Sequence, residues 1–197
     1  MLPAEIRDAL PSDAEAIARL HATSWRDAYR GIMPDAYLDG PLEESLGEHW
    51  RVQLGGDGCA GSIVLLALVE GTLTGFVAGR PEPVGCSAAL IENLHVHPAH
   101  RGRGLGRELL GLAAGRLAAA GCCGISLWVY DDNRAALTFY DQLGADVTET
   151  GLEQVGGAVL AHRRLAWPDA AALARLCALG REGASRSTCS RMPQVQD

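Results

Sequence analysis

The sequence predicts a mixed α/β (α+β) fold, with about seven strands in one twisted sheet and helices on both of its faces. Apolar runs of strand length alternate with stretches whose apolar residues recur at helical spacing. One strand–helix–strand unit, from 88 to 129, should place its two strands parallel with a right-handed crossover. The 197-residue chain is long enough for one domain with a sizeable core, which we assign to residues 1–167.

The first part of this domain is predicted to contain one strand and two helices. Residues 5–9 have the pattern of a short strand. Ser12 precedes an apolar helical stripe and Glu15 lies three residues later, so the pair matches a capping box at a helix start. A break at 31–34 separates this helix from a second one at 41–54.

The rest of the domain alternates strands with helices that end at glycines. Gly71 separates two apolar runs and predicts a hairpin, and Gly121 follows the last periodic residue of a long helix. The run 124–130 is apolar throughout, as in a buried parallel strand. The predicted elements in order are strands at 62–70, 73–80 and 88–97, a helix from Leu105 to Gly121, a strand at 124–130, a helix at 133–143, and strands at 145–155 and 158–167.

Residues 168–197 are predicted to form a C-terminal extension. A short helix fits 170–179. The stretch 181–197 is polar and rich in serine and arginine, which predicts disorder. A homodimer formed through the last strands or the 170–179 helix is compatible with the sequence.

Charge and composition exclude several classes of function. The formal net charge of −7 argues against nonspecific nucleic-acid binding and favours a cationic substrate. All 17 basic residues are arginine, so the lysine of a P-loop or of a Schiff-base enzyme is absent. No apolar run with strand character is long enough to span a membrane. The six cysteines form no C-x-x-C pair and no signal peptide is evident, so we expect a cytoplasmic protein.

The most informative segment is the glycine-rich stretch 96–106, which joins a strand to a helix. Three alternate glycines expose backbone N–H groups, and the start of the helix adds a partial positive charge. Arg101 and Arg103 add further positive charge, so the segment predicts a pyrophosphate site. The dinucleotide fingerprint G-x-G-x-x-G fails here, because its third glycine would fall on Arg107 or Leu109.

The pattern V-x-P-x-x-R-G-x-G-x-G in this stretch resembles the acetyl-CoA-binding motif of the GNAT superfamily of N-acetyltransferases. The resemblance extends over roughly residues 5–167 and implies the GNAT fold with acetyl-CoA as cosubstrate and no metal. It implies that the strand before the loop pairs with the pantetheine arm, which assigns this contact to Leu94, His95 and Val96. The phosphates are then assigned to Arg101, Gly102, Arg103, Gly104, Leu105 and Gly106.

A second segment, 128–140, resembles another landmark of the family. Asn133 and Tyr140 are seven residues apart and share one helix face. The resemblance implies that Asn133 contacts the pantetheine and that Tyr140 lies near the thioester sulfur. A tyrosine hydroxyl is a workable proton donor to a departing thiolate, whereas the alternative is an aromatic core residue.

The acceptor side is less specific in the sequence. Glu92 interrupts an apolar strand and is predicted to act as a base, directly or through water, because an attacking amine must lose its proton. The alternative is an internal ion pair with an arginine. Trp25 and Tyr29 belong to a segment that resembles a substrate-side helix of the family, and they fit an acceptor pocket or the core equally well.

The histidines at 95, 97 and 100 do not complete a tetrahedral set, so we expect no metal. Three functions remain open at this point. The first is acetyl transfer to a small-molecule amine, the second is acetylation of protein N-termini or lysines, and the third is a non-catalytic acyl-CoA-binding module. The partners expected are acetyl-CoA and an amine, without nucleic acid or membrane.

Overall fold

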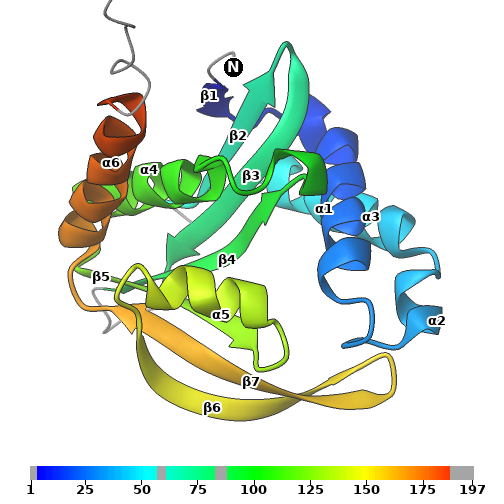
Figure 1. Cartoon of the computed structure of the whole chain (residues 1–197). Coiled ribbons are helices and arrows are strands. Elements are labelled where there is room, and N and C mark those ends of the chain that lie inside the picture. The colour runs from blue at the N-terminus through cyan, green and yellow to red at the C-terminus, as the bar shows by residue number, and fades with distance from the viewer. Residues whose placement is uncertain (1–3, 57–60, 83–87, 187–197) are drawn as a thin grey trace, which may run out of the picture.

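The computed structural model describes residues 4–56, 61–82 and 88–186 and contains a seven-stranded mixed sheet (Figure 1). The strand order is β1-β2-β3-β4-β5-β7-β6, and every neighbouring pair is antiparallel except β4 and β5. This confirms the predicted fold class. The main elements in chain order are β1 (Glu5–Asp8), α1 (Ala14–Ala28), α2 (Asp35–Leu38), α3 (Leu42–Gly55), β2 (Ile63–Val69), β3 (Thr72–Pro81), β4 (Ala88–Val96), α4 (Leu105–Ala119), β5 (Gly124–Tyr130), α5 (Arg134–Asp141), β6 (Asp146–Val155), β7 (Ala158–Trp167) and α6 (Ala170–Arg186).

The start of α1 differs from the prediction. A short 3-10 turn precedes the helix, which begins at Ala14, and no side chain caps it. The carboxylate of Asp13 instead accepts two hydrogen bonds from Arg7 of β1, at 2.7 and 2.8 Å. The predicted capping box of Ser12 and Glu15 is therefore wrong, because the neighbouring aspartate has a stronger, charged partner in the sheet.

Helices cover both faces of the sheet (Figure 1). On one face, α4 buries Leu109 and Leu117 against strands β2 to β5. On the other face, α1 and α3 bury Ile17 and Trp50 against Phe76 of β3. Because side chains alternate along a strand, each central strand contributes to both cores.

The C-terminal helix α6 is longer than predicted and packs against α4. It runs through Arg186 and so includes the first residues of the stretch predicted to be disordered; residues 187–197 lie outside the described part of the chain. Leu173 and Cys177 of α6 are buried in the same core as α4. The domain boundary predicted at 168 remains a prediction, but the helix beyond it contributes to the main core.

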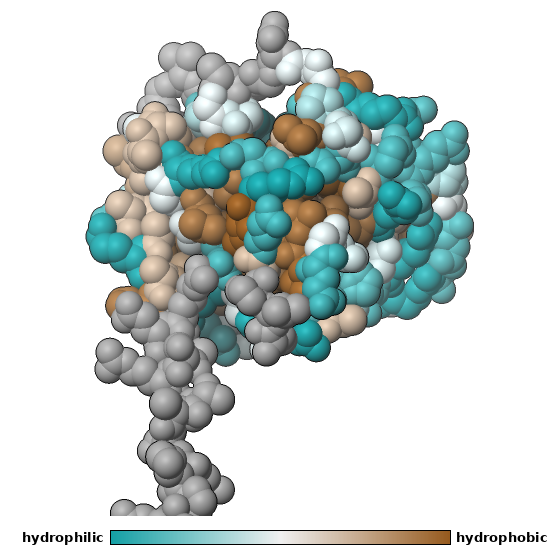
Figure 2. Space-filling view, turned by 90° about the horizontal axis from the view of Figure 1, so that it is seen from above, coloured by the Kyte–Doolittle hydropathy of each residue, from teal (hydrophilic) through white to brown (hydrophobic). Residues whose placement is uncertain are grey.

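The surface seen from above has apolar residues gathered near its middle, with hydrophilic residues around them and over one side (Figure 2). Among the described residues, no helix combines the length and the apolar character needed to cross a bilayer. Three cysteines in this part of the chain, at 122, 123 and 177, are free thiols, whereas those at 59, 86 and 189 lie outside it.

Close packing of α6 on α4 depends on Gly111, which predicts opposite effects at two glycines of one helix. A Cβ at Gly111 would lie 2.5 Å from Cys177 Cβ, whereas one at Gly115 would lie 3.6 Å from Ala174 Cβ. We expect Gly111→Ala to lower the free energy of unfolding by about 1–3 kcal/mol through overpacking. The control Gly115→Ala should leave the free energy of unfolding unchanged or raise it by up to about 1 kcal/mol, because alanine has the higher helix propensity. Urea denaturation measures both, and an equal or higher stability for Gly111→Ala would contradict this packing.

Candidate functional site

The glycine-rich turn between β4 and α4 is open at two positions. Gly102 and Gly104 have φ angles of 72° and 82°, in the left-handed region that favours glycine. A Cβ built on either residue meets no atom within 4 Å. A ligand can therefore approach this backbone closely from outside.

The first turn of α4 points its N–H groups into this opening. The amides of Gly104, Leu105 and Gly106 have no hydrogen-bond acceptor in the described part of the chain, as is normal for the start of a helix. Leu105 is buried in the core, and this fixes where the helix begins. Together with the partial positive charge of a 15-residue helix, the turn has the character of an anion site.

The side chain of Arg101 turns away from the opening. Its Nε donates to the Val96 carbonyl oxygen at 3.1 Å, and its guanidinium bonds to Asp27 and to Ser24 of α1. The sequence assigned this residue to phosphate, but its charge is engaged by an aspartate. Arg101 therefore anchors the turn to α1, while Arg103 lies exposed in the turn.

Strands β4 and β5 pair only over their first three residues and then separate. Their parallel pairing covers only Ala88–Leu90 with Gly124–Ser126, although both strands continue further. A β-bulge in β4 leaves Glu92 without a partner on β3, and such bulges bend a strand. The facing edges of β4 beyond Leu90 and of β5 beyond Ser126 are therefore unpaired and lead to the glycine turn.

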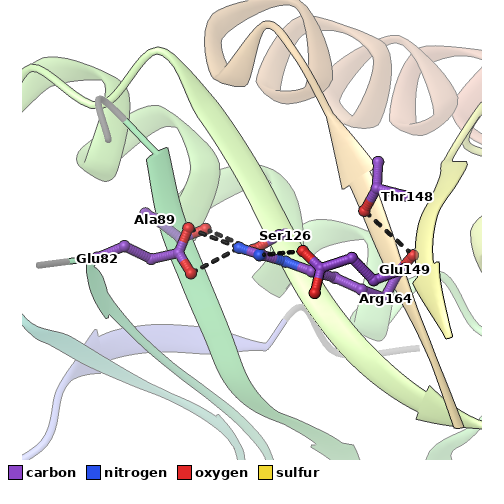
Figure 3. Close-up of polar contacts among 6 residues, drawn as sticks. All are labelled: Glu82, Ala89, Ser126, Thr148, Glu149 and Arg164. Carbon is purple, nitrogen blue, oxygen red and sulfur yellow. Dashed lines mark hydrogen bonds and ion pairs between the residues drawn. The ribbon is translucent and has the colours of Figure 1, made fainter. Parts of the chain in front are cut away.

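A single guanidinium lies where the two strands begin to separate (Figure 3). Arg164 of β7 donates to Ser126 Oγ of β5 at 2.9 Å and to both carboxylate oxygens of Glu82 at 2.6 Å. It also donates to Glu149 of β6 at 2.8 Å. Arg164 and Glu82 are each about one-fifth exposed, so removing the arginine would leave a largely buried carboxylate unpaired. The fork between β4 and β5 is thus held by charges from the end of β3, from β6 and from β7.

His95 packs on the α1 face of β4, opposite Leu94 and Val96. Its Nδ1 lies 3.0 Å from Ser24 Oγ, and its ring is 4.4 Å from that of His21. Burial lowers the pKa of His95 to about 3, and the nearby charge of Arg101 acts in the same direction. Because the ring contacts Ser24 and His21, we expect a ligand along the open edge of β4 to meet the backbone of His95.

His21 completes this buried pair. Its Nδ1 accepts a hydrogen bond from Trp50 Nε1 at 3.2 Å, so a proton on the neutral ring sits on Nε2. Nε2 is buried and has no partner among the described residues. Burial lowers the pKa of His21, and His95 adds to the effect. Both rings are neutral near pH 7.

The predicted base Glu92 is held in an ion pair. Its Oε1 accepts from Arg80 Nε at 2.8 Å, and both side chains are partly exposed. The structure thus forms the arginine pair that the sequence left open as the alternative. A direct approach of an amine to Oε1 would compete with that guanidinium.

Helix α5 positions both residues of the second motif. Asn133 is its N-cap, and its Oδ1 accepts from the Ala136 amide at 3.2 Å. Tyr140 is buried, with its ring 5.9 Å from that of Trp167. Burial raises the pKa of Tyr140, and the proximity of Tyr29 raises it further, so the hydroxyl is protonated at neutral pH.

Trp25 and Tyr29 form a chain of ring contacts that extends from α1 to β5. Trp25 contacts Tyr29 edge-on at 5.6 Å, and Tyr29 contacts Tyr130 of β5 in the same way at 5.6 Å. Burial raises the pKa of Tyr29, whereas its hydrogen bond with Asn133 opposes the rise. Tyr29 therefore lies between α1, β5 and the start of α5.

A further group of side chains lies on the last three strands and is not among the residues predicted from the sequence. Tyr130 donates to Glu153 Oε2 at 2.7 Å, and His162 lies beside both. The available signal was the period-2 alternation that places these residues on one face, although the register between strands is not readable from one sequence. Elsewhere in the described ranges, no cluster of three His, Cys, Asp or Glu side chains is arranged to bind a metal.

Comparison with known proteins identifies one family for this chain. The profile of the Acetyltransferase (GNAT) family matches residues 22–145, which is more than half of the chain. The uncharacterized N-acetyltransferase YuaI of Bacillus subtilis is 26% identical over 174 residues, covering 87% of this chain and 96% of that protein.

Solved structures share the fold. The PaiA N-acetyltransferase from Thermoplasma acidophilum, solved in complex with coenzyme A, is 22% identical with a TM-score of 0.66, over 82% of this chain and 98% of that one. The putative acetyltransferase YncA from Salmonella typhimurium, solved with its cofactor acetyl-CoA, is 20% identical with a TM-score of 0.64, over 85% and 94%.

The open glycine turn predicts a specific loss of affinity in one variant. We expect Gly104→Asp to weaken acetyl-CoA binding at least about tenfold, because it adds a negative charge and a Cβ where phosphate would meet the backbone. The control Gly71→Asp places the same residue at a φ of 76° in a hairpin turn, where a Cβ also meets nothing. Calorimetric affinity that is equal in both variants would contradict a phosphate site at this turn.

The buried histidines predict a decline of stability in acid. Below pH 6.5 the unfolded chain binds a proton at position 95, whereas the folded chain does so only near pH 3. The free energy of unfolding should therefore fall by about 1.4 kcal/mol per pH unit from this residue as the pH drops through that window. His95→Gln should reduce the slope by this amount in denaturation curves from pH 6 to 4. An unchanged slope would show that His95 is not buried in its neutral form.

Proposed function

Because the chain belongs to the acetyltransferase (GNAT) family, we propose that it transfers the acetyl group of acetyl-CoA to a primary amine by direct attack in a ternary complex. We further propose that the acceptor is a small molecule. The observation that carries the proposal is the pair of unpaired strand edges on β4 and β5, which ends at the open glycine turn.

The cosubstrate fits this opening in two parts. The peptide-like groups of a pantetheine arm can pair with the free edge of β4 at Leu94, His95 and Val96, as an added strand would. Because Leu94 and Val96 pack against the core, the contact is made by their backbone. The pyrophosphate then meets the amides at Gly102, Gly104 and the first turn of α4. We assign Asn133, the N-cap of α5, to a contact with the pantetheine arm.

The reaction moves one proton from nitrogen to sulfur. The amine nitrogen attacks the thioester carbonyl carbon, the tetrahedral species collapses, and the C–S bond breaks. Tyr140 donates its hydroxyl proton to the departing thiolate and recovers one from the substituted ammonium through water. Burial keeps the phenol protonated, which suits a hydrogen-bond donor to a developing negative charge.

Glu92 has a narrower role in this proposal than the sequence indicated. Arg80 occupies its Oε1, so Glu92 acts on the acceptor through water and not by direct contact. The net charge of −7 favours a cationic acceptor.

The test is to measure CoA thiol release with acetyl-CoA and a panel of small amines, amino acids and peptides. We expect turnover with at least one small amine, because the proposed reaction requires only acetyl-CoA and an amine. Release only with peptides would assign the acceptor to proteins. Tight acetyl-CoA binding without thiol release from any amine would support a non-catalytic module.

In the same assay, Tyr140→Phe should lower kcat by about a hundredfold or more, the usual range for loss of a general acid. Its dissociation constant for acetyl-CoA should change less than about threefold, because only a hydroxyl is lost from a packed ring. Tyr37→Phe, at a half-exposed tyrosine near Trp25, serves as the matched control. Equal losses in turnover and in affinity for Tyr140→Phe would assign the hydroxyl to binding.

A further inference from the structure

A row of aromatic rings lies on one face of the last strands. Trp128 and Tyr130 of β5 are register partners of Arg164 and His162 of β7, so these side chains share a face. The His162 ring stacks on Trp128 at 4.4 Å and 27°, and it lies nearly parallel to Tyr130 at 6.2 Å and 19°. Trp128 is 40% exposed. We call Trp128, His162 and Tyr130 the aromatic row.

A glycine on β6 makes the row possible. Gly151 is the register partner of His162, and a Cβ there would lie 2.6 Å from His162 Nε2 and 3.1 Å from Cδ2. Any side chain at 151 would therefore push the imidazole off the sheet. The glycine allows the imidazole to lie between the two larger rings.

One carboxylate stands at the end of the row with no guanidinium partner. Glu153 Oε2 accepts from the Tyr130 hydroxyl at 2.7 Å and lies 3.8 Å from His162 Nδ1. The side chain is half exposed, and no hydrogen bond involves Oε1 within the described ranges. By contrast, Glu149 and Glu92 are each bound by an arginine. Glu153 therefore presents an oriented anion to solvent.

The row is connected to the proposed reaction centre but does not coincide with it. Tyr130 contacts Tyr29 ring to ring at 5.6 Å, and Tyr29 is close enough to Tyr140 to affect its pKa. Two tyrosines thus separate Glu153 from the phenol assigned to the leaving thiolate. A group bound at Glu153 would therefore be a different group from the reacting nitrogen.

We propose that Glu153 and the aromatic row bind a second positively charged group of the acceptor, which makes the preferred substrate a small diamine. This inference rests on the proposed acetyl transfer. The reacting amine must be neutral, whereas the distant amine stays protonated at neutral pH. A carboxylate and the faces of aromatic rings are the groups that recognise such an ammonium. A monoamine of equal length lacks the second cation and so gains nothing from Glu153. An acceptor with a carboxylate in that position would be repelled by Glu153.

The experiment compares matched pairs of acceptors: putrescine with butylamine, and cadaverine with pentylamine. In the thiol-release assay we expect kcat/KM for the diamine to exceed that for its monoamine by about tenfold, since both a charged hydrogen bond and a cation–π contact are gained. Glu153→Gln should remove most of this ratio while changing the monoamine less than about twofold. The control Glu149→Gln removes a carboxylate from the same strand and face, and it should leave the ratio intact.

A second variant tests the row without altering charge. Gly151→Ala should displace His162 and lower the diamine-to-monoamine ratio about threefold or more, while circular dichroism reports whether the sheet is retained. Equal turnover of diamine and monoamine, unchanged by Glu153→Gln, would overturn this inference and leave the acetyl transfer standing. Acetyl-CoA binding by calorimetry with no turnover of any amine would overturn the proposed function, and this inference with it.

Discussion

The fold and the site depend on one constraint, which is that the hydrogen-bonded pairing between β4 and β5 stops partway along the two strands. The two strands pair over only three residues each and then separate, although both have further backbone groups to satisfy. A bulge at Glu92 bends β4, and the Arg164 guanidinium holds the ends of the neighbouring strands at the fork. Backbone groups left open in this way can be satisfied by water or by a ligand with its own amides. This constraint explains why the glycine turn, α5 and the aromatic side chains gather at one end of the sheet.

Side chains on both faces of β4 hold the glycine-turn end of the strand in place. On one face, Val96 and Leu105 pack into the core, which sets where α4 begins. On the other face, His95 and Arg101 bond to Ser24 of α1. Because these side chains are engaged with the protein, the backbone of the turn is left for the ligand. The arrangement therefore favours recognition by N–H groups over recognition by flexible charged side chains, which loses less conformational entropy on binding.

Local patterns were readable from the sequence, and contacts between distant segments were not. The strand and helix order and the glycine turn follow from periodicity and from φ preferences within a few residues, and the parallel β4–β5 pair follows from the helix that connects the two strands. The capping box at Ser12 failed because Asp13 is bound by Arg7 of the sheet. The contact of Arg101 with Asp27, 74 positions away, is likewise invisible to any local pattern. The Glu153 site needs three strands in register, and the sequence fixes that register only weakly where both faces carry polar residues.

The use of arginine alone for positive charge agrees with this picture. None of the 17 basic residues is lysine, so an enzyme with the proposed chemistry offers no lysine amine to its own acyl donor. A guanidinium can also bond to several groups at once, as Arg164 does to Glu82, Ser126 and Glu149, because its donors are spread over separate nitrogens. Arginines neutralise the carboxylates that hold the sheet together, while Glu153 is oriented by a phenol instead. A carboxylate held by a phenol is not neutralised by a guanidinium, and in the function proposed here this separates the residues that build the site from the one assigned to the acceptor.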